Sequence, residues 1–327
     1  MESSYLLSVI VTVHNEEKYI DACLCSILDE RRDLSVEIIV VDDGSTDSSK
    51  DILLSYQERF DNLKVIVQPY CQGVSVARNT GVMNAVGKYV LFVDGDDFLI
   101  SDNFKRFVDY ISLCEEKDIF LYGVSCFDEA LQLVKRTERP TEIRGCGAKI
   151  LNSWIQSGFY SAIRNKIVSR NYILKHAILF MPGIIYEDVL WTAQLFAYDP
   201  SVEYVDIYVY GNRVHHNSTT KTANLQNKIF SLSKIYESIE NLAKKHDKKS
   251  PLYSKALRTI LSGIFFQLLS NTKRLLPTLR NSEREYYIDY LEQRKEIMRF
   301  SHKFNRRYIY YPIAHLFNIK TLINLRK

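Results

Sequence analysis

The first hundred residues alternate between short apolar runs and amphipathic stretches. The runs are residues 8–13, 36–41, 65–68 and 89–93, and they are rich in β-branched and aromatic side chains. Continuous apolar runs of this length are typical of strands that are buried on both faces of a parallel sheet. Strands that alternate with helices over short connections form such sheets. The sequence therefore predicts an α/β fold with a doubly wound, mostly parallel sheet.

An acidic cluster follows the fourth run directly. Asp94, Asp96 and Asp97 come straight after the apolar residues 89–93. Burying these carboxylates is costly unless they meet a cation or emerge beyond the carboxyl ends of the strands, where open α/β sheets bind ligands. The Asp-Gly-Asp spacing leaves two carboxylates able to bind one hard divalent ion and the phosphates that it neutralises. A tight turn is the alternative, because Asp-Gly is also a common hairpin signal.

A second acidic pair, Asp42 and Asp43, ends the second run. We expect Asn15 to cap the helix after the first strand, and Ser45 or Thr46 to cap the helix after the second. Two acidic pairs that converge on one edge of a sheet predict a nucleotide and metal site. The surrounding glycines match neither the dinucleotide-binding fingerprint nor the P-loop, so another class of nucleotide site is indicated.

Length and composition restrict the remaining possibilities. The chain has 327 residues, which suits two domains or one α/β domain with an appendage, and its net charge of +4 is too mild to indicate a nucleic-acid partner. The six cysteines include no Cys-x-x-Cys pair, which favours reduced thiols in a cytoplasmic protein over a zinc site. The start of the chain lacks signal-peptide features, and residues 260–269 are too short an apolar stretch to span a bilayer.

The middle of the chain is expected to complete the site. Residues 120–126 and 131–136 are predicted to form a hairpin beyond the acidic cluster. Residues 149–176 contain Arg164, Lys166 and Arg170. These cations are interpreted as solvated charges on a helix, and the alternative is that they help to hold a diphosphate.

Glu187 and Asp188 precede an apolar helical pattern over residues 189–197. The pattern places Asp188 in the first turn of a helix, where the macrodipole favours its ionised form. A carboxylate that stays ionised can accept a proton. Acidic residues at helix starts also serve stability alone, so the pattern by itself leaves both roles open.

Four ordered motifs carry a resemblance to a known family. They are residues 8–15, residues 37–47, the stretch from Gly73 through Ala77-Arg78-Asn79-Thr80-Gly81, and Asp94-Gly95-Asp96-Asp97. In this order they resemble the motifs of family 2 glycosyltransferases with the GT-A fold. The resemblance covers roughly the first hundred residues well, with further matches to about residue 220.

The resemblance implies roles for the residues of the first half. Thr12 and Asp43 would contact the uracil of a UDP-sugar, Arg78 would lie along the nucleotide, and Asp94 would reach the ribose. Asp96 would bind Mg²⁺ or Mn²⁺ against the diphosphate. Without the resemblance, the simplest interpretations are an exposed helix cation for Arg78 and an ordinary strand-end residue for Thr12.

The resemblance also assigns the chemistry. Asp188 would be the general base, with Glu187 as a supporting contact, and a single displacement would invert the anomeric centre. Arg213 falls in a stretch that folds over the donor in similar proteins. In some of them a histidine of this stretch completes the metal shell, which makes His215 and His216 candidate ligands; exposed loop histidines are the alternative. Asp42 and Asp97, which are next to Asp43 and Asp96 in the sequence, complete the expected site.

The chain is predicted to divide near residue 220. Residues 1–220 would form the glycosyltransferase domain, with a nucleotide-sugar half to about residue 100 and an acceptor half after it. Residues 221–327 show helical patterns over 229–245, 253–276 and 283–304. Residues 294–327 combine many cations with aromatic residues, which suits an amphipathic segment on an anionic membrane surface. The alternative is a solvated helix packed on the catalytic domain.

The predicted function is that of an inverting, metal-dependent transferase. It would move a hexose-type sugar from a UDP-sugar to a hydroxyl of a saccharide or lipid-linked acceptor, with bacterial surface polysaccharide synthesis as the setting that the resemblance implies. A haloacid-dehalogenase-like phosphatase also has Asp-x-Asp after an apolar strand, but on its first strand. A non-catalytic sugar-binding protein is the other alternative, and the presence of both Asp96 and Asp188 argues against it.

Overall fold

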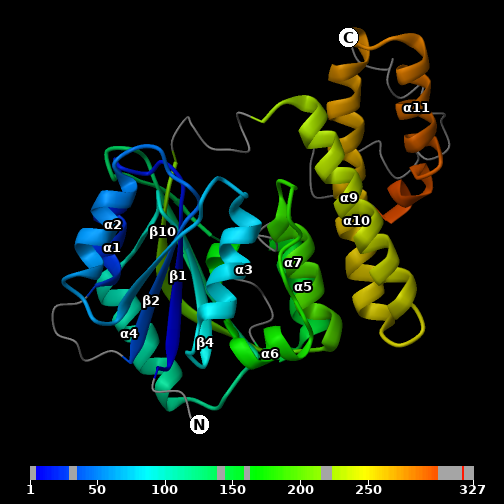
Figure 1. Ribbon diagram of the computed structural model, residues 1–327. Helices are drawn as coiled ribbons and strands as arrows, with labels where there is room; N and C mark the ends of the chain where they lie inside the picture. Colours follow the sequence, from blue (N-terminus) through cyan, green and yellow to red (C-terminus); the bar gives the residue numbers. More distant parts are fainter. Residues whose placement is uncertain are drawn as a thin grey trace.

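The computed structural model describes residues 5–28, 35–137, 144–157, 163–214, 223–300 and residue 319 (Figure 1). Its strands are β1 (Leu7–Val13), β2 (Val36–Asp42), β3 (Leu63–Val67), β4 (Tyr89–Asp94), β5 (Phe98–Leu99), β6 (Ile119–Phe127), β7 (Leu133–Arg136), β8 (Arg144–Cys146), β9 (Lys166–Ser169) and β10 (Ser201–Arg213). Its helices are α1 (Ile20–Ile27), α2 (Ser49–Gln57), α3 (Val74–Asn84), α4 (Ser101–Leu113), α5 (Gly147–Ser157), α6 (Arg170–Lys175), α7 (Glu187–Leu195), α9 (Leu225–His246), α10 (Pro251–Leu275) and α11 (Asn281–Glu292).

The strands form one mostly parallel sheet in the order β3-β2-β1-β4-β9-β6-β10-β5. The four strands predicted in the first half of the chain are β1 to β4, and they pair with one another in parallel. Strand β9 runs antiparallel between β4 and β6, and β7 pairs with β6 as the predicted hairpin. The prediction of a mostly parallel α/β sheet is therefore confirmed.

Helices cover both faces of the sheet, because successive side chains of a buried strand point to opposite sides. Val9 and Val11 of β1 belong to the core cluster beneath α1, α2 and α4, whereas Ile10 between them belongs to the cluster beneath α3. Figure 1 shows α1, α2 and α4 on one side of the sheet, with α3 and α5 to α7 on the other. This double coverage explains why the strands carry long apolar runs instead of a strict alternation of apolar and polar residues.

The helix starts after β1 and β2 differ from the predicted ones. Helix α1 begins at Ile20, and Asn15 instead adopts a left-handed conformation with φ of 57°. Its side-chain oxygen accepts a hydrogen bond from the backbone N–H of Thr46 at 2.8 Å. Helix α2 begins at Ser49, so neither Ser45 nor Thr46 caps it. These polar residues tie the two strand-end loops to each other, and that tertiary contact displaces the local capping role.

Strand β9 replaces part of the helix that was expected over residues 149–176. Lys166 begins this four-residue strand, between the helices α5 and α6. The tertiary structure decides this, because β9 completes the gap between β4 and β6 and pairs with both. The interpretation of Lys166 as a solvated helix charge is wrong, since its side chain is fully buried.

Long helices follow the sheet, as the sequence predicts. Helices α9 and α10 pack against each other, and α10 also packs against α5 (Figure 1). The third predicted helix is interrupted: α11 ends at Glu292, and a short 3₁₀ helix spans Lys295–Phe300. A distant contact coincides with this end, because the Glu292 carboxylate accepts a hydrogen bond from the N–H of Ile319 at 2.8 Å. Among the described residues, no helix combines the length and apolarity needed to cross a bilayer.

Most of the basic segment 294–327 lies outside the described residues, and its contact with a membrane stays a prediction. The division of the chain near residue 220 likewise stays a prediction.

Candidate active site

The ends of three parallel strands bring the predicted acidic residues to one edge of the sheet. Thr12 of β1 lies opposite Asp94 of β4, and Val13 lies opposite Asp42 of β2. The backbone N–H of Asp43 donates to the carbonyl of Val13 at 2.8 Å, which extends the pairing past the strand. The predicted convergence of the two acidic pairs is therefore present in the structure.

The acidic cluster after β4 gathers three carboxylates. One oxygen from each of Asp94, Asp96 and Asp97 lies within 4.8 Å of the others. Oxygen donors of this kind suit Mg²⁺ or Mn²⁺. Asp96 is partly exposed and Asp97 is buried, so the cluster sits where the sheet edge meets solvent.

Asp97 braces the loop rather than facing outward. Its side chain is 2% exposed. One oxygen accepts hydrogen bonds from the Tyr210 hydroxyl at 2.8 Å and from Arg164 at 3.4 Å, and the other accepts from the N–H of Arg213 at 2.7 Å. Burial raises the pKa of Asp97 well above its usual value, and the neighbouring Asp96 adds to this, while Arg164 opposes it. The candidate cation ligands are therefore Asp94 and Asp96.

Glu16 joins this cluster, and the sequence analysis did not single it out. Its side chain lies against Gly95, where an added Cβ would be 3.4 Å from the Glu16 Cγ atom. Burial, followed by the charges of Asp96, Asp94 and Asp47, raises the pKa of Glu16 to about 8. A concentration of carboxylate charges that raises the pKa of Glu16 is an environment that a divalent cation would stabilise. The residues present therefore fit the implied metal.

Arg78 joins the acidic cluster to the start of α7. Its guanidinium donates to the Asp94 carboxylate at 2.7 Å and to the Glu187 carboxylate. The Arg78 side chain is only 4% exposed, so the interpretation as an exposed helix cation is wrong. Burial pushes the pKa of Asp94 upward, but the charges of Arg78 and Arg164 outweigh it and hold the pKa below its usual value. Arg78 therefore keeps Asp94 ionised.

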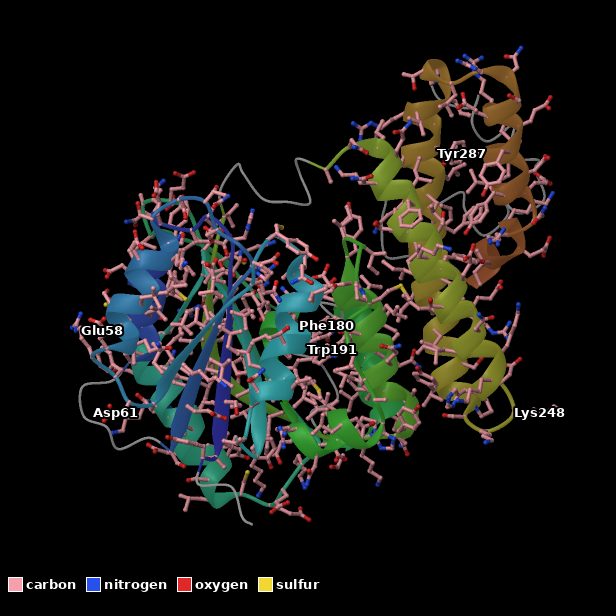
Figure 2. All side chains as sticks on the ribbon, viewed as in Figure 1. Glu58, Asp61, Phe180, Trp191, Lys248 and Tyr287 are labelled. Carbon is pink, nitrogen blue, oxygen red and sulfur yellow. The ribbon has the colours of Figure 1, made fainter. Side chains whose placement is uncertain are left out.

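An aromatic pair lies beside the Arg78 guanidinium that joins Asp94 to Glu187. Phe180 and Trp191 are stacked with ring centroids 4.7 Å apart, and Figure 2 shows them side by side near α3 and α7. The Arg78 guanidinium lies 5.4 Å from the Phe180 ring. The side-chain amide of Asn79 exchanges two hydrogen bonds of 2.9 Å with the backbone of Phe180. The Arg78-Asn79 pair therefore fixes the loop before α7 as well as the guanidinium.

Glu187 and Asp188 start α7, as the sequence predicts. The preceding Tyr186 has a left-handed backbone with φ of 65°, an uncommon conformation for a bulky residue that often accompanies functional sites. Burial, and then the charge of Glu187, raise the pKa of Asp188 to about 6, against the opposing charges of Lys166 and Arg78. Burial thus outweighs the helix dipole, which was expected to favour the ionised form. A carboxylate with a pKa near 6 is ionised at neutral pH and is still basic enough to accept a proton.

Two cations from the segment before α6 face this carboxylate. Lys166 is buried and its ammonium donates to the Thr192 hydroxyl at 3.3 Å. Burial lowers the pKa of Lys166 to about 7, against the favourable charge of Asp188. Arg164 pairs with Asp97 and its charge also acts on Asp188. The solvated interpretation of Arg164 and Lys166 is therefore wrong, because both side chains point into the acidic edge.

A comparison with known protein families identifies the family of this chain. The family described as glycosyl transferase family 2 matches residues 8–172, which is half of the chain. The chain belongs to glycosyl transferase family 2. The haloacid-dehalogenase alternative is not favoured by this match.

Relatives of this family 2 glycosyltransferase are similar over different lengths. An uncharacterized glycosyltransferase, YibD of Escherichia coli, is 28% identical over 252 residues, which cover 75% of this chain and 72% of YibD. The poly(ribitol-phosphate) beta-glucosyltransferase of Bacillus spizizenii is 39% identical over 106 residues, 32% of this chain and 17% of that protein.

Solved structures show that the fold is of the GT-A type. S. aureus TarS 1–349 in complex with UDP-GlcNAc has a TM-score of 0.69 at 21% identity, covering 97% of this chain and 89% of TarS 1–349. The mannosyltransferase PcManGT of Pyrobaculum calidifontis, in complex with GDP-Man and Mn²⁺, has a TM-score of 0.53 at 16% identity, covering 98% of this chain and 87% of PcManGT.

The nucleotide-binding edge of this family 2 glycosyltransferase contains further polar contacts. The Asp43 carboxylate accepts hydrogen bonds from the N–H groups of Gln72 at 2.7 Å and Gly73 at 2.8 Å. His14 Nδ1 lies 2.8 Å from the carbonyl of Asp43, and the Cys71 thiol donates to its carboxylate at 3.3 Å. Asp43 thus organises the loop before α3. Its contact with uracil stays a prediction.

Asp42 has a structural contact of its own. It is buried, and one carboxylate oxygen accepts a hydrogen bond from the N–H of Ser45 at 3.0 Å. The other oxygen has no hydrogen-bond partner within the described ranges. The loop after it turns at Gly44, which has φ of 68° and whose added Cβ would lie 2.5 Å from the backbone of Tyr70. Asp42 therefore shapes the turn that places Asp43.

Arg213 lies against the acidic cluster, and its place over the donor stays a prediction. Its Nε donates to the carbonyl of Asp96 at 3.0 Å, and its guanidinium lies 5.0 Å from the ring of Tyr19. The neighbouring candidates His215 and His216 lie outside the described residues. Their ligation of a metal stays a prediction.

Proposed function

We propose that this glycosyltransferase transfers a hexose-type sugar from a UDP-sugar to a hydroxyl of a saccharide or lipid-linked acceptor, with inversion at the anomeric carbon. The observation that carries the proposal is the bridge through Arg78. It joins Asp94 of the acidic cluster to Glu187, the residue directly before Asp188. A candidate cation site and a candidate base therefore face one edge of the sheet.

A uridine donor is supported by the fold neighbour. TarS, which shares the fold over 97% of this chain, is solved in complex with UDP-GlcNAc and with UDP. Thr12 and Asp43 stand at the strand ends where we propose that the uracil binds. Arg213 would lie beside the diphosphate, since its guanidinium is anchored at the Asp96 carbonyl.

Asp94 and Asp96 would hold Mn²⁺ or Mg²⁺, and the contact of Asp94 with the ribose, which the resemblance implies, stays a prediction. When bound, the metal would neutralise the charge that develops on the departing diphosphate. PcManGT, another fold neighbour, is solved with Mn²⁺. Arg78 would keep Asp94 ionised for this role because it lies 2.7 Å from that carboxylate.

Asp188 would act as the general base. It would take the proton of the acceptor hydroxyl as that oxygen forms a bond to the anomeric carbon and the bond to the UDP oxygen breaks. Its pKa of about 6 suits proton transfer near neutral pH. Glu187 would act through Arg78, as a positioning residue, rather than on the acceptor itself.

The decisive experiment measures UDP release from a panel of UDP-sugars with manganese, with and without saccharide acceptors. We expect release that depends on manganese and is lost in Asp188→Asn. A non-catalytic binding protein would show thermal stabilisation by a UDP-sugar without release, and a phosphatase would cleave phosphate esters instead. Either result would contradict the proposal.

The basic segment 294–327 carries a separate proposal. Its cations and aromatic residues would hold the enzyme on an anionic membrane surface, next to a lipid-linked acceptor and in a bacterial surface polysaccharide pathway. The test is sedimentation of the full chain with anionic liposomes at low salt. A chain that stays in the supernatant would exclude this contact.

A further inference from the structure

A second pocket lies away from the acidic edge. It has a volume of about 480 Å³ and lies between the start of α4, the hairpin of β6 and β7, and the middle of β10. Its lining residues are Ile100, Asn103, Arg106, Ser125, Phe127, Leu133, Arg136, Asp206, Ile207 and Tyr208. None of these residues belongs to the site described above.

Two guanidinium groups line the pocket. Arg106 comes from α4 and Arg136 from the end of β7, and both are exposed. In the part of the chain that the structure describes, neither forms an ion pair with a carboxylate. Asp206 contributes one negative charge to the same lining, so the pocket keeps a net positive charge.

A buried hydroxyl without a partner lies beside these cations. Ser125 is 1% exposed and lines the pocket, and its Oγ has no hydrogen-bond partner among the residues that the structure describes. Ser125 is paired directly with Arg136 in the β6–β7 ladder, so the two side chains lie on the same side of the hairpin. A buried hydroxyl that lacks a partner costs stability, and a bound acceptor atom would remove that cost.

Tyr208 forms one wall of the pocket and makes several contacts there. The Tyr208 ring fills the space above Gly123, where an added Cβ would meet the ring at 2.6 Å. Its hydroxyl donates to the carbonyl of Thr137 at 3.3 Å, and its own carbonyl accepts from the Asn103 side chain at 2.9 Å. The Arg136 guanidinium lies 5.0 Å from the Tyr208 ring, a contact that restricts this exposed side chain. A side chain that is partly ordered beforehand loses less freedom when it binds an anion.

We propose that this pocket binds the anionic group, a phosphate or a carboxylate, of a charged saccharide unit. Arg106 and Arg136 would bind the anion, Ser125 would donate its hydroxyl, and the apolar residues Phe127, Leu133 and Ile207 would contact the carbon skeleton of the sugar.

The pocket is connected with the acidic edge through aromatic contacts. Phe127 packs on Phe98 with ring centroids 5.2 Å apart, and the Arg213 guanidinium lies 5.5 Å from the Phe98 ring. We place in this pocket a charged unit of the acceptor chain whose hydroxyl reaches Asp188. This assignment to the acceptor rests on the proposed function, whereas binding of the anion does not.

The test measures binding of glucuronate and glucose 6-phosphate to the full chain by titration calorimetry, with inorganic phosphate as the probe without a sugar. We expect Arg106→Gln and Arg136→Gln each to weaken the binding of glucuronate and of glucose 6-phosphate by about tenfold or more. Arg59→Gln is the matched control, because Arg59 also lies over a tyrosine, 5.3 Å from the ring of Tyr56. It should leave binding unchanged.

Further variants separate this pocket from the donor site and from a structural role. Arg213→Gln should leave glucuronate binding unchanged, and Ser125→Ala should weaken it without lowering the melting temperature. Binding that is lost in Arg213→Gln but kept in Arg106→Gln would overturn the inference. The inference would also be overturned if neither glucuronate nor glucose 6-phosphate bound, or if inorganic phosphate bound as tightly as these two ligands. The titration needs no turnover, so it gives an answer even if UDP release from UDP-sugars fails.

Discussion

Arg78 of α3 and Asp94 of β4 form a largely buried ion pair of 2.7 Å, and the same guanidinium holds Glu187 at the start of α7. Residues that are 109 positions apart in the sequence are thereby joined within one site. The consequences for stability and activity can be measured separately.

We expect Arg78→Met to lower the free energy of unfolding by about 3 kcal/mol, because it leaves two carboxylates without their partner. The measurement is urea unfolding at neutral pH. Adding Glu187→Gln to Arg78→Met should recover part of the loss, since one of the uncompensated charges is then removed. Arg59→Gln, at an exposed arginine, should change stability by less than about 0.5 kcal/mol. Equal effects of Arg78→Met and Arg59→Gln would contradict the described ion pairs.

Asp188→Asn tests the proposed base. We expect kcat to fall by about 100-fold or more, because the amide cannot accept the proton of the acceptor. Binding of the UDP-sugar should change much less, which thermal shift with the donor would show. Asp51→Asn, at an exposed acid in the first turn of α2, is the control and should keep wild-type activity.

The pH profile of the wild-type enzyme follows from the same residue. Because the pKa of Asp188 is raised to about 6, the active ionised form is lost as the pH falls through that value. We therefore expect kcat/KM to fall about tenfold per pH unit as the pH drops below about 6. The profile is recorded with saturating manganese. A constant rate down to pH 4.5 would exclude a base with this pKa.

Asp96 and Asp97 should separate metal binding from stability. Asp96→Ala is expected to weaken the response to manganese with little change in stability. Asp97→Ala leaves Tyr210, Arg164 and the backbone of Arg213 without their acceptor and should lower the unfolding free energy by about 2 kcal/mol or more. Manganese titration and urea unfolding of both variants provide the comparison. If Asp97→Ala weakened the manganese response and Asp96→Ala lowered the unfolding free energy, the assignment of metal binding to Asp96 and of stability to Asp97 would be wrong.

Two helical glycines should respond in opposite directions to alanine. An added Cβ at Gly81 of α3 would lie 2.3 Å from a side-chain carbon of Ile10, so Gly81→Ala should destabilise the protein by about 1–3 kcal/mol. Gly263 of α10 has no neighbour from another element within 4 Å of an added Cβ in the described part of the chain, so Gly263→Ala should stabilise the protein by about 0.5–1 kcal/mol. Thermal unfolding of both variants tests the packing of α3 on β1.

The sequence predicted the sheet well because each strand is marked by its own local pattern. The apolar runs of β1 to β4, the hairpin of β6 and β7 and the start of α7 at Glu187 were all found in this way. Strand β9 was missed, since its four residues carry two polar side chains and their burial depends on β4 and β6. The helix caps were misplaced because Asn15 bonds to the distant Thr46.

The site was predicted in its acidic members and missed in its partners. Asp94 and Asp96 follow a strand and are visible as a pattern, whereas Glu16 looks like any surface acid in the sequence. Nothing local indicates that Glu16 faces Asp96 or that Lys166 faces Asp188. These relationships are contacts between separate elements.

By itself the sequence determined the succession of strands and helices and the positions where acidic residues end the strands, because both are set by side chains that are neighbours along the chain. Only the tertiary structure decided the partners and protonation of those acids. The pKa of Asp188 and the pairing of Arg78 depend on burial and on charges brought from other elements, and an electrostatic interaction is set by distance in space rather than by separation in sequence.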